Sequence, residues 1–415
     1  MSLAVASGCT PKNSLLNSTT PLSVRMVESE MKRNPDAITM DGVKNPKWNY
    51  TTGLELLAIM DAGERYNRPE FAEYATSWVD RMVSEDGRSI VTYNLAKHNL
   101  DHICPGRLLY RVWDATGEER YREAQRLLWE QLKSQPRTPE GGYWHKRAYP
   151  NQMWLDGLYM AEPYKCEYLV RYDGTEGVDA THGWQDVVRQ FTLVAEKTYD
   201  PETGLFRHAW DASKEMFWCD KTTGQSQHAW LRAMGWYTVA IVEVLDIMPA
   251  DVEDRAHLVA ILNHIFTTIP HFANPKSGMW YQVMDCPERE GNYEESTGSI
   301  MLTYAMMKAA RLGVVDAEYG TKGRKLYENF VERFMRENED GTISMTDCCS
   351  VGGLGGKNNR MGDFAYYLSE PIIENDCKGV GPFIWASLEY EGVAKQPTLR
   401  TSLARTKDIG GKKSI

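Results

Sequence analysis

The chain has 415 residues, of which 42% are hydrophobic and 25% are charged, so it can bury the core of a large globular protein. Its net charge of -10 argues against a nucleic-acid-binding protein, because that function needs a concentrated basic face. A small anionic substrate, held by a local arginine or lysine, is not excluded. The chain is rich in Trp (13) and Tyr (22), whose rings suit stacking against sugars as well as core packing.

The two ends of the chain are expected to lie outside the folded core. Residues 1–9 (MSLAVASGC) resemble the clipped end of a lipoprotein signal, although the apolar run is too short for a working one. The protein would be periplasmic or lipid-anchored if that signal is real, and cytoplasmic otherwise. No stretch is long and apolar enough for a membrane span. We expect residues 1–20 to be a poorly structured leader or linker, and the polar residues 393–415 to be an extension.

Between these ends the sequence predicts helix after helix. Apolar residues recur three and four positions apart, which is the pattern of helices with one buried face. Apart from the first and last, the twelve predicted helices form consecutive pairs. They cover residues 24–31, 54–60, 71–82, 103–113, 121–132, 158–172, 184–198, 231–245, 254–269, 299–312, 325–336 and 380–388.

A glycine recurs between successive pairs of predicted helices. These positions are Gly87, Gly141, Gly204, Gly278 and Gly341, and each predicts a short hairpin that leads from an outer helix to the next inner one. Repeated helix pairs indicate a repeat architecture. Six inner and six outer helices can close into a ring, which needs no polar caps. We therefore predict an all-α fold, an (α/α)6 barrel, as a single catalytic domain over residues 21–392.

One carboxylate stands inside an apolar run at the start of a predicted helix. Asp156 is flanked by Trp154, Leu155, Leu158 and Tyr159. Partial removal of water favours a neutral carboxylic acid, which can serve as a proton donor near pH 7. The alternative is that Asp156 only caps the helix, because aspartate is a favoured N-cap residue.

Further polar and aromatic candidates lie just after the hairpins or at the starts of inner helices. Carboxylates, imidazoles and indoles on one rim are typical of a carbohydrate site with acid–base groups. The candidates are Trp48, Tyr50, Asp101, His145, Lys146, Trp154, His208, Trp230, Arg232 and Trp236. Each has a structural alternative, since a lone tryptophan is more often core and Asp101 can cap a helix. We interpret His98, His102 and His228 as structural or surface residues, and Asp211 as a turn former.

The eight cysteines have no metal-binding or disulfide spacing, and Cys348 and Cys349 are adjacent. We therefore expect buried free thiols, with no metal and no other cofactor.

Several of these segments together resemble a known enzyme family. The run YPNQMWLDGLYM (149–160), with Asp101 upstream and WLRAMGW (230–236) downstream, is similar to the unsaturated rhamnogalacturonyl hydrolases of glycoside hydrolase family 105. These enzymes are related to the unsaturated glucuronyl hydrolases of family 88. Further matches are ESTGS (295–299), YYLSEP (366–371), ND (375–376) and GVG (379–381). The resemblance covers roughly residues 21–390 and implies an (α/α)6 barrel.

The resemblance also implies a reaction without metal or nucleotide. Its substrate is an oligosaccharide that carries a 4,5-unsaturated uronic acid, most simply galacturonyl-rhamnose from rhamnogalacturonan. Asp156 would act as acid and then base, with Asp101 as the second carboxylate. By motif match His208, Arg232 and Trp236 would line the pocket, together with His145 and Trp154. The place of Trp48, Tyr50 and Trp230 on the predicted rim adds them as substrate-binding candidates. Arg232 is the best candidate to bind the substrate carboxylate. The family usually has Gly and an amide where this chain has Ala233 and Met234.

Three other functions remain open from the sequence. One is a family 88 hydrolase acting on glycosaminoglycan or other glucuronate-containing fragments. A polysaccharide lyase is disfavoured, because it needs a Tyr or His base with a cation beside the uronate. A sugar-binding barrel without activity would use its aromatic residues as platforms only. The only predicted partner is the oligosaccharide, and the protein is expected to be a monomer or a homodimer.

Overall fold

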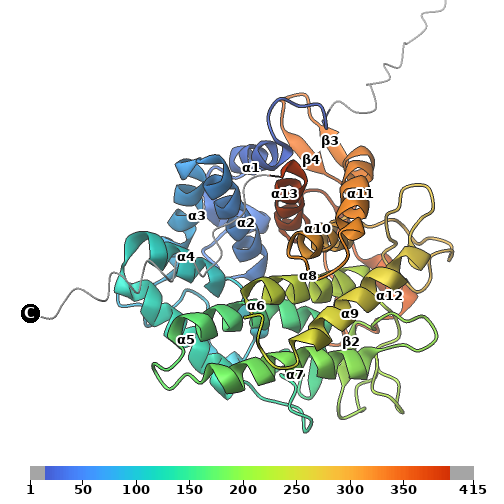
Figure 1. Cartoon of the computed structure of the whole chain (residues 1–415), viewed down its shortest axis with the longest axis horizontal. Coiled ribbons are helices and arrows are strands. Elements are labelled where there is room, and N and C mark those ends of the chain that lie inside the picture. The colour runs from blue at the N-terminus through green and yellow to red at the C-terminus, as the bar shows by residue number, and fades with distance from the viewer. Residues whose placement is uncertain (1–14, 393–415) are drawn as a thin grey trace, which may run out of the picture.

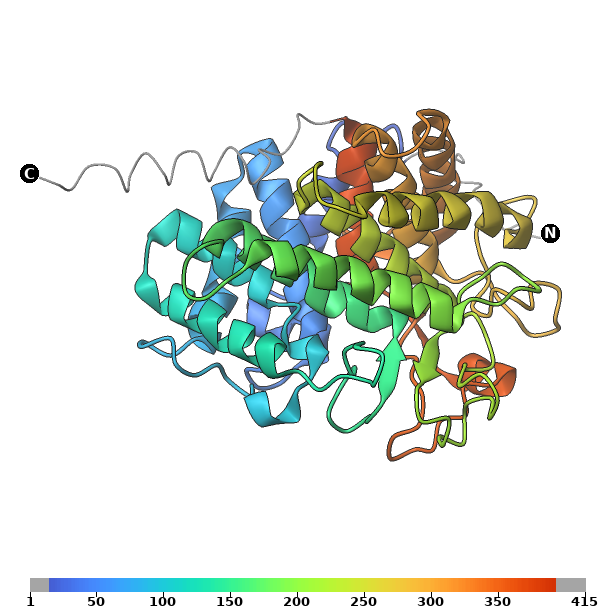
Figure 2. The ribbon, with the colours of Figure 1, turned by 60° about the horizontal axis from the view of Figure 1, so that its bottom comes forward.

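The computed structural model describes residues 15–392, which form two layers of helices (Figures 1 and 2). The inner helices are α2 (Tyr50–Tyr66), α4 (Gly106–Thr116), α6 (Leu155–Tyr172), α8 (Leu231–Ile247), α10 (Ser296–Arg311) and α13 (Cys377–Glu391). The outer helices are α1 (Leu22–Arg33), α3 (Pro69–Met82), α5 (Glu119–Ser134), α7 (Ala180–Thr198), α9 (Arg255–Thr268) and α11 (Glu318–Phe334).

The inner helices form a closed ring. Each contacts the next along the chain, and α13 returns to contact α2. The first helix, α1, packs on α13 and so completes the sixth pair. The predicted (α/α)6 barrel is therefore confirmed, with the twelve helices in the predicted order. One additional short helix, α12 (Phe364–Ser369), was not predicted and lies in the connection between α11 and α13.

The two layers differ in how much of each helix is buried. In α8 every residue from position 231 to position 245 is buried, whereas α5 buries only one stripe. A helix that is apolar all round must be covered on every side, so it takes an inner position. An amphipathic helix leaves its polar face in water and takes an outer one. The composition of each helix thus places it in the ring.

The five predicted hairpins each connect an outer helix to the next inner one. Their glycines all adopt positive φ angles, from 70° at Gly87 to 97° at Gly141. Glycine reaches this region without steric cost. Antiparallel bridges flank the turns, for example Val83 with Ile90 and Ala273 with Trp280. After the last outer helix the hairpin is made by β3 (Met335–Glu337) and β4 (Ile343–Met345).

Short elements fill the end of the barrel where the hairpins enter the inner helices. Two antiparallel strand pairs lie there, β1 (Gln152–Trp154) with β2 (Ala209–Asp211), and β5 (Cys348–Cys349) with β6 (Ile372–Ile373). The 3-10 helices are η1 (Ala37–Gly42), η2 (Leu95–Lys97), η3 (Leu100–His102) and η4 (Ile269–Phe272). Figure 2 shows loops and strands from distant parts of the chain gathered at this end.

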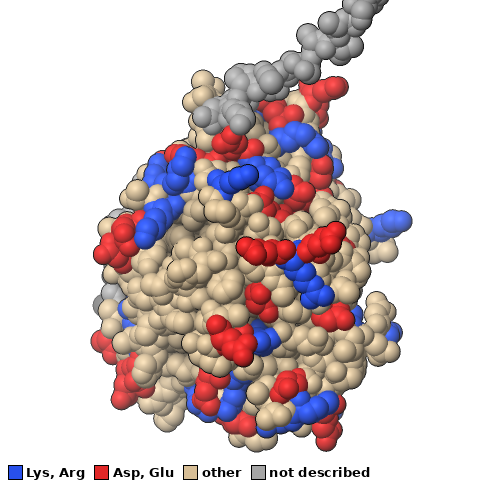
Figure 3. Space-filling view, turned by 90° about the vertical axis from the view of Figure 1, so that its right-hand side faces the viewer, with Lys and Arg blue, Asp and Glu red and all other residues tan. Residues whose placement is uncertain are grey.

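The described residues begin slightly before the predicted domain. Leu15 is already buried in the core, so the packed structure starts ahead of residue 21. The lipoprotein-like residues 1–9 and the extension at 393–415 lie outside the described residues. Within residues 15–392, no helix combines the length and apolar character needed to cross a lipid bilayer. On the face in Figure 3, acidic and basic side chains are interspersed among uncharged ones.

A buried ionic network ties three inner helices together. Glu243 of α8 accepts from Lys308 Nζ at 2.6 Å, from Tyr304 at 2.6 Å and from Arg107 at 2.9 Å. Burial alone would raise the pKa of Glu243, but Lys308 and Arg107 outweigh it and lower the pKa to about 2. The folded protein therefore favours the ionised form of Glu243 more strongly than the unfolded chain does.

We expect Glu243→Gln to lower the free energy of unfolding at pH 7 by about 3 kcal/mol. The substitution removes the carboxylate that Lys308 and Arg107 share, and within the described chain leaves them paired only with Asp246 and Glu167. A depressed folded pKa stabilises the protein above the unfolded pKa of about 4.3. That contribution is lost as the pH falls toward 2, so wild type and variant should converge there. Denaturant titrations at several pH values measure both effects.

The matched control is Glu318→Gln, which breaks an exposed pair with Lys322 and should change stability little. Equal stability of wild type and Glu243→Gln at pH 7 would contradict the assigned role of the network.

Candidate active site

The first turns of the inner helices meet at the hairpin end, and several of them carry the predicted site residues. Tyr50 begins α2, Asp156 is the second residue of α6, and Arg232 is the second residue of α8. Glu295 and Asp376 are the N-cap residues of α10 and α13. Burial raises the pKa of the Tyr50 hydroxyl, and the charges of Asp101, Arg232, Asp376 and Asp156 also act on it. These groups therefore surround one region, and the positive ends of the helices favour an anion there.

Asp156 does not cap its helix. The N-cap residue of α6 is Trp154, and no side chain caps this end. Oδ2 of Asp156 lies 3.2 Å from Nε2 of His208, and both atoms are shielded from solvent. Oδ1 has no hydrogen-bond partner within residues 15–392, and the side chain is 12% exposed. The capping alternative is therefore wrong, and one oxygen of Asp156 is free to meet a ligand.

His208 is fully buried and held on all sides. It directly precedes β2, whose pairing with β1 brings it next to the start of α6. Its backbone carbonyl accepts from the N–H of Leu155 at 3.1 Å. Its ring lies 4.7 Å from that of Trp230 and meets the edge of Trp154 at 5.3 Å. Nδ1 lies 2.7 Å from the hydroxyl oxygen of Tyr367.

Asp101 has a different environment from Asp156. Lys146 Nζ lies 2.5 Å from its Oδ2, and His145 Nε2 lies 3.2 Å from its Oδ1. Burial by itself would raise the pKa of Asp101, but Lys146 and His145 outweigh it and hold that pKa far below its usual range. Asp101 is thus an anion at any physiological pH. Asp101 lies in the short helix η3 and not in the first turn of an inner helix.

Gly157 allows His145 to approach the start of α6. A Cβ at this position would lie 3.1 Å from Nδ1 of His145 and 3.3 Å from the side chain of Leu100. Such contacts are tighter than ordinary packing permits. Because Gly157 has no side chain, the imidazole of His145, which contacts Asp101, can lie against the first turn of α6.

Trp154 lies in an aromatic stack and does not present an open face. His145 covers one ring face at 4.8 Å, and Tyr149 stacks on it at 5.1 Å, both nearly parallel. Tyr149 in turn accepts from Arg360 at 3.2 Å. Trp154 therefore supports the rim that carries Asp101 and Asp156. It cannot stack on a sugar while these neighbours remain in place.

Arg232 is buried beside the same region. Its Nη1 donates to the carbonyl of Cys349, and its guanidinium lies 4.5 Å from the centre of the Trp230 ring. Burial opposes its charge, but neighbouring groups, including Asp376 and Glu295, keep its pKa above the usual value. No carboxylate lies within ion-pair distance in the described part of the chain, and Nη2 has no protein acceptor there. The guanidinium thus keeps a free donor at the helix N-terminus.

The remaining predicted tryptophans are core residues. Trp48 is fully buried, stacks on Trp78 at 5.2 Å and donates to the carbonyl of His102 at 2.7 Å. The structure therefore does not bring Trp48 to the site surface. Trp236 is also buried, and its ring meets that of Tyr50 edge to face at 6.2 Å, so it supports a site residue. Trp230 is buried against His208 and Arg232.

The sequence matches the family described as Glycosyl Hydrolase Family 88 over residues 22–394. A solved family 105 glycoside hydrolase of C. acetobutylicum is 37% identical, with a TM-score of 0.84, and the match covers 90% of this chain and all of that one. The chain belongs to the glycoside hydrolases of families 88 and 105.

Two curated proteins are also similar to this hydrolase. Protein Atu3128 of Agrobacterium fabrum is 35% identical over 214 residues, which is 49% of this chain and 89% of the relative. The unsaturated rhamnogalacturonyl hydrolase YesR of Bacillus subtilis is 24% identical over 312 residues, which is 72% of this chain and 78% of the relative. These matches confirm the family resemblance inferred from the sequence motifs.

Tyr367 was not predicted as a site residue, and Arg360 was expected only as a substitute cation for the substrate carboxylate if Arg232 does not bind it. Tyr367 is 159 positions from His208 in sequence, yet it is hydrogen-bonded to it. Arg360 is held by the carbonyl of Gly355 and by Tyr149, with no acidic partner in the described residues. Tyr367 falls in a matched motif, YYLSEP, which was the one available signal. Nothing in local spacing could link either residue to Asp156.

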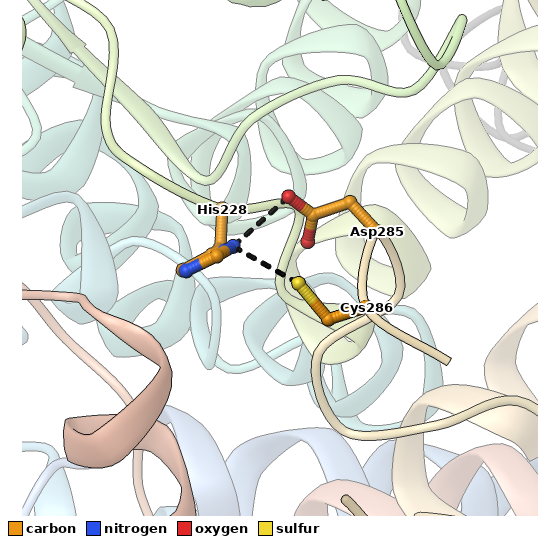
Figure 4. A group of neighbouring side chains, drawn as sticks. All are labelled: His228, Asp285 and Cys286. Atoms are coloured by element: carbon orange, nitrogen blue, oxygen red, sulfur yellow. Dashed lines mark hydrogen bonds and ion pairs between the residues drawn. The ribbon is translucent and has the colours of Figure 1, made fainter. Parts of the chain in front are cut away.

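One cluster of the hydrolase has the residue types of a metal site. Nδ1 of His228 lies 2.9 Å from Oδ2 of Asp285 and 3.8 Å from Sγ of Cys286 (Figure 4). Oδ1 of Asp285 accepts from the N–H of Ala229 at 3.2 Å. Asp285 thus bonds both to the side chain of His228 and to the backbone. The cluster fixes the backbone at His228, and the carbonyl of His228 accepts a hydrogen bond from the N–H of His208.

Proposed function

We propose that this hydrolase removes a 4,5-unsaturated uronic acid from the non-reducing end of oligosaccharides produced by a polysaccharide lyase. The observation that carries the proposal is the contrast between its two carboxyl groups. Asp101 is bound by a lysine and a histidine, whereas the carboxylate of Asp156 has His208 as its only polar side-chain neighbour among residues 15–392, and its Oδ1 is free there. Two carboxyls in different environments can divide the roles of fixed anion and proton donor.

In this mechanism Asp156 first protonates the substrate and then activates water. Its acid proton adds to carbon 4 of the vinyl ether, and positive charge develops at carbon 5. The resulting carboxylate takes a proton from water as the oxygen of that water bonds to carbon 5. The hemiketal then opens and releases the neighbouring sugar, and Asp156 is again protonated. The net change is addition of one water molecule, followed by cleavage.

The charges around Asp156 suit both the substrate and the developing cation. Arg232 and the helix N-termini favour the substrate carboxylate. Asp101, as a permanent anion, can stabilise positive charge on the sugar ring. A base of the lyase type would instead be a Tyr or His beside the uronate.

For the attached sugar we propose rhamnose, with a galacturonyl-derived unsaturated unit. The motif matches and the name of the relative YesR support this choice. The alternative is a glucuronyl-derived unit from glycosaminoglycan. Ala233 and Met234, which depart from the family pattern, are both buried. Their side chains therefore do not offer polar contacts to the sugar.

The test follows the ultraviolet absorbance of the conjugated double bond during incubation with two substrates. One is lyase-digested rhamnogalacturonan, and the other is lyase-digested glycosaminoglycan. We expect absorbance to fall, and to fall faster with the rhamnogalacturonan fragments. A fall with glycosaminoglycan alone would establish the alternative substrate. Rising absorbance on undigested polymer would indicate a lyase, and no change in any mixture would indicate a binding protein.

A further inference from the structure

A buried tyrosine hydroxyl is hydrogen-bonded to Nδ1 of His208, the ring nitrogen that does not face Asp156. Tyr367 is fully buried, and the only hydrogen-bond partner of its hydroxyl within residues 15–392 is Nδ1 of His208, at 2.7 Å. Burial raises the pKa of this hydroxyl well above its usual value, so it keeps its proton. Its ring is fixed by stacking on Trp230 at 5.8 Å, and its backbone carbonyl accepts from Gln282 at 3.2 Å.

The direction of this hydrogen bond can be deduced from the donors. A phenol has one proton, and the only acceptor within its reach among the described residues is Nδ1 of His208. If His208 donated instead, the phenolic proton would be buried without a partner. An unpaired buried donor is costly, whereas an unused lone pair is tolerated more easily. Tyr367 therefore donates, and Nδ1 carries no proton. The imidazole is then the neutral tautomer with its proton on Nε2.

We propose that Tyr367 is a positioning residue for the reaction: its hydroxyl fixes the Nε2–H tautomer of His208 and thereby directs that N–H at Oδ2 of Asp156. The Nε2–Oδ2 distance is 3.2 Å, but the two groups are not aligned as a formed hydrogen bond. Catalytic pairs are often loose before substrate binds and tighten in the complex. The chain Tyr367–His208–Asp156 joins residues from α12, the segment before β2, and α6.

This arrangement decides which oxygen of Asp156 carries the acid proton. Because Nε2–H faces Oδ2, this oxygen becomes the acceptor when the pair tightens in the complex, and the proton of the neutral acid is placed on Oδ1. Oδ1 is the oxygen without a protein partner. When its proton passes to the alkene carbon, the carboxylate left behind keeps the Nε2–H bond. The proton taken from water then returns to Oδ1. In the opposite tautomer the acid proton would be drawn to Oδ2, toward His208 and away from the substrate.

The inference rests on the proposed function for its kinetic consequence, but the tautomer can be measured without substrate. The experiment records ¹⁵N NMR of the full-length protein labelled at histidine, with His208→Gln to assign the signal. We expect His208 to have a protonated Nε2 and an unprotonated Nδ1. A protonated Nδ1, alone or together with Nε2, would overturn the proposal whatever the enzyme hydrolyses.

The kinetic arm uses Tyr367→Phe, which removes one oxygen and keeps the stacked ring. We expect kcat to fall about tenfold, which corresponds to one lost hydrogen bond, with KM changed less than about twofold. A rise in KM with unchanged kcat would mean that Tyr367 serves binding and would reject the positioning role. Tyr237→Phe is the matched control, since its buried hydroxyl donates to the carbonyl of Phe191 at 2.8 Å, in the core. It should lose a similar amount of stability and no activity.

A double-variant comparison tests whether Tyr367 acts through His208, and the NMR experiment on the unsubstituted protein stands even if Tyr367→Phe does not fold. The amide of His208→Gln can donate to Asp156 without any help from position 367. It should therefore retain more activity than His208→Ala, and adding Tyr367→Phe to it should lower kcat little further. A full tenfold loss in that background would show that Tyr367 does not act through His208.

Discussion

Asp156→Asn should abolish nearly all turnover of an unsaturated disaccharide while leaving the protein folded. Asparagine keeps the shape of the side chain, but it cannot deliver an acid proton. Loss of general acid catalysis costs about 10²–10⁴ in rate, and more if the same group also activates water. Stability should change little, since Asp156 forms no cap and, in the described part of the chain, no ion pair other than its contact with His208. The measurement is kcat from the decay of the double-bond absorbance, with circular dichroism to verify folding.

The matched control for this substitution is Asp179→Asn. Asp179 is the N-cap residue of α7, an outer helix, and accepts from the N–H of His182 at 3.1 Å. This variant should keep full activity. If Asp156→Asn remained within a few-fold of wild type, the acid would be elsewhere. Asp101 would be the next carboxyl to examine, although its ion pair with Lys146 makes it a poor proton donor.

Arg232→Ala should raise KM by about ten- to a hundredfold, because a hydrogen bond to a charged group contributes about 1.5–3 kcal/mol. The free Nη2 is the atom that we expect to meet the substrate carboxylate. Arg232→Lys tests the geometry, since it keeps the charge but loses the planar fork. It should bind more weakly than wild type and more tightly than the alanine variant. Initial rates over a range of substrate concentrations measure these effects.

Arg232→Ala also removes a cation near Glu295 and Asp376, so it can change stability as well as binding. Thermal unfolding of the same variants measures that change in stability separately. Folded Arg232→Ala with an unchanged KM would mean that another cation binds the uronate. Arg360 would then be the residue to change, since it has no acidic partner within the described chain. Arg360→Met should in that case raise KM instead.

The amino-acid sequence by itself determined the helices, their order and the ring. Apolar periodicity is a local property, and it separated the helices from their connections. The five glycines were recognisable because a tight hairpin requires a positive φ at one position. Helix starts were less certain, and that uncertainty mattered at one place. The prediction began α6 at residue 158, but the helix begins at Leu155, which puts Asp156 in its first turn.

Only the tertiary structure decided how the candidate residues divide between surface and support. Trp48 and Trp154 are residues of the type that stacks on sugars, yet both are buried against neighbouring rings. The partner of a side chain comes from another hairpin, often more than a hundred residues away, and is fixed by closure of the ring. The contact between His208 and Tyr367 arises in this way. Local sequence records the chemistry of each group, but the pairing that gives Asp156 and Asp101 different roles depends on which elements the closed ring brings side by side.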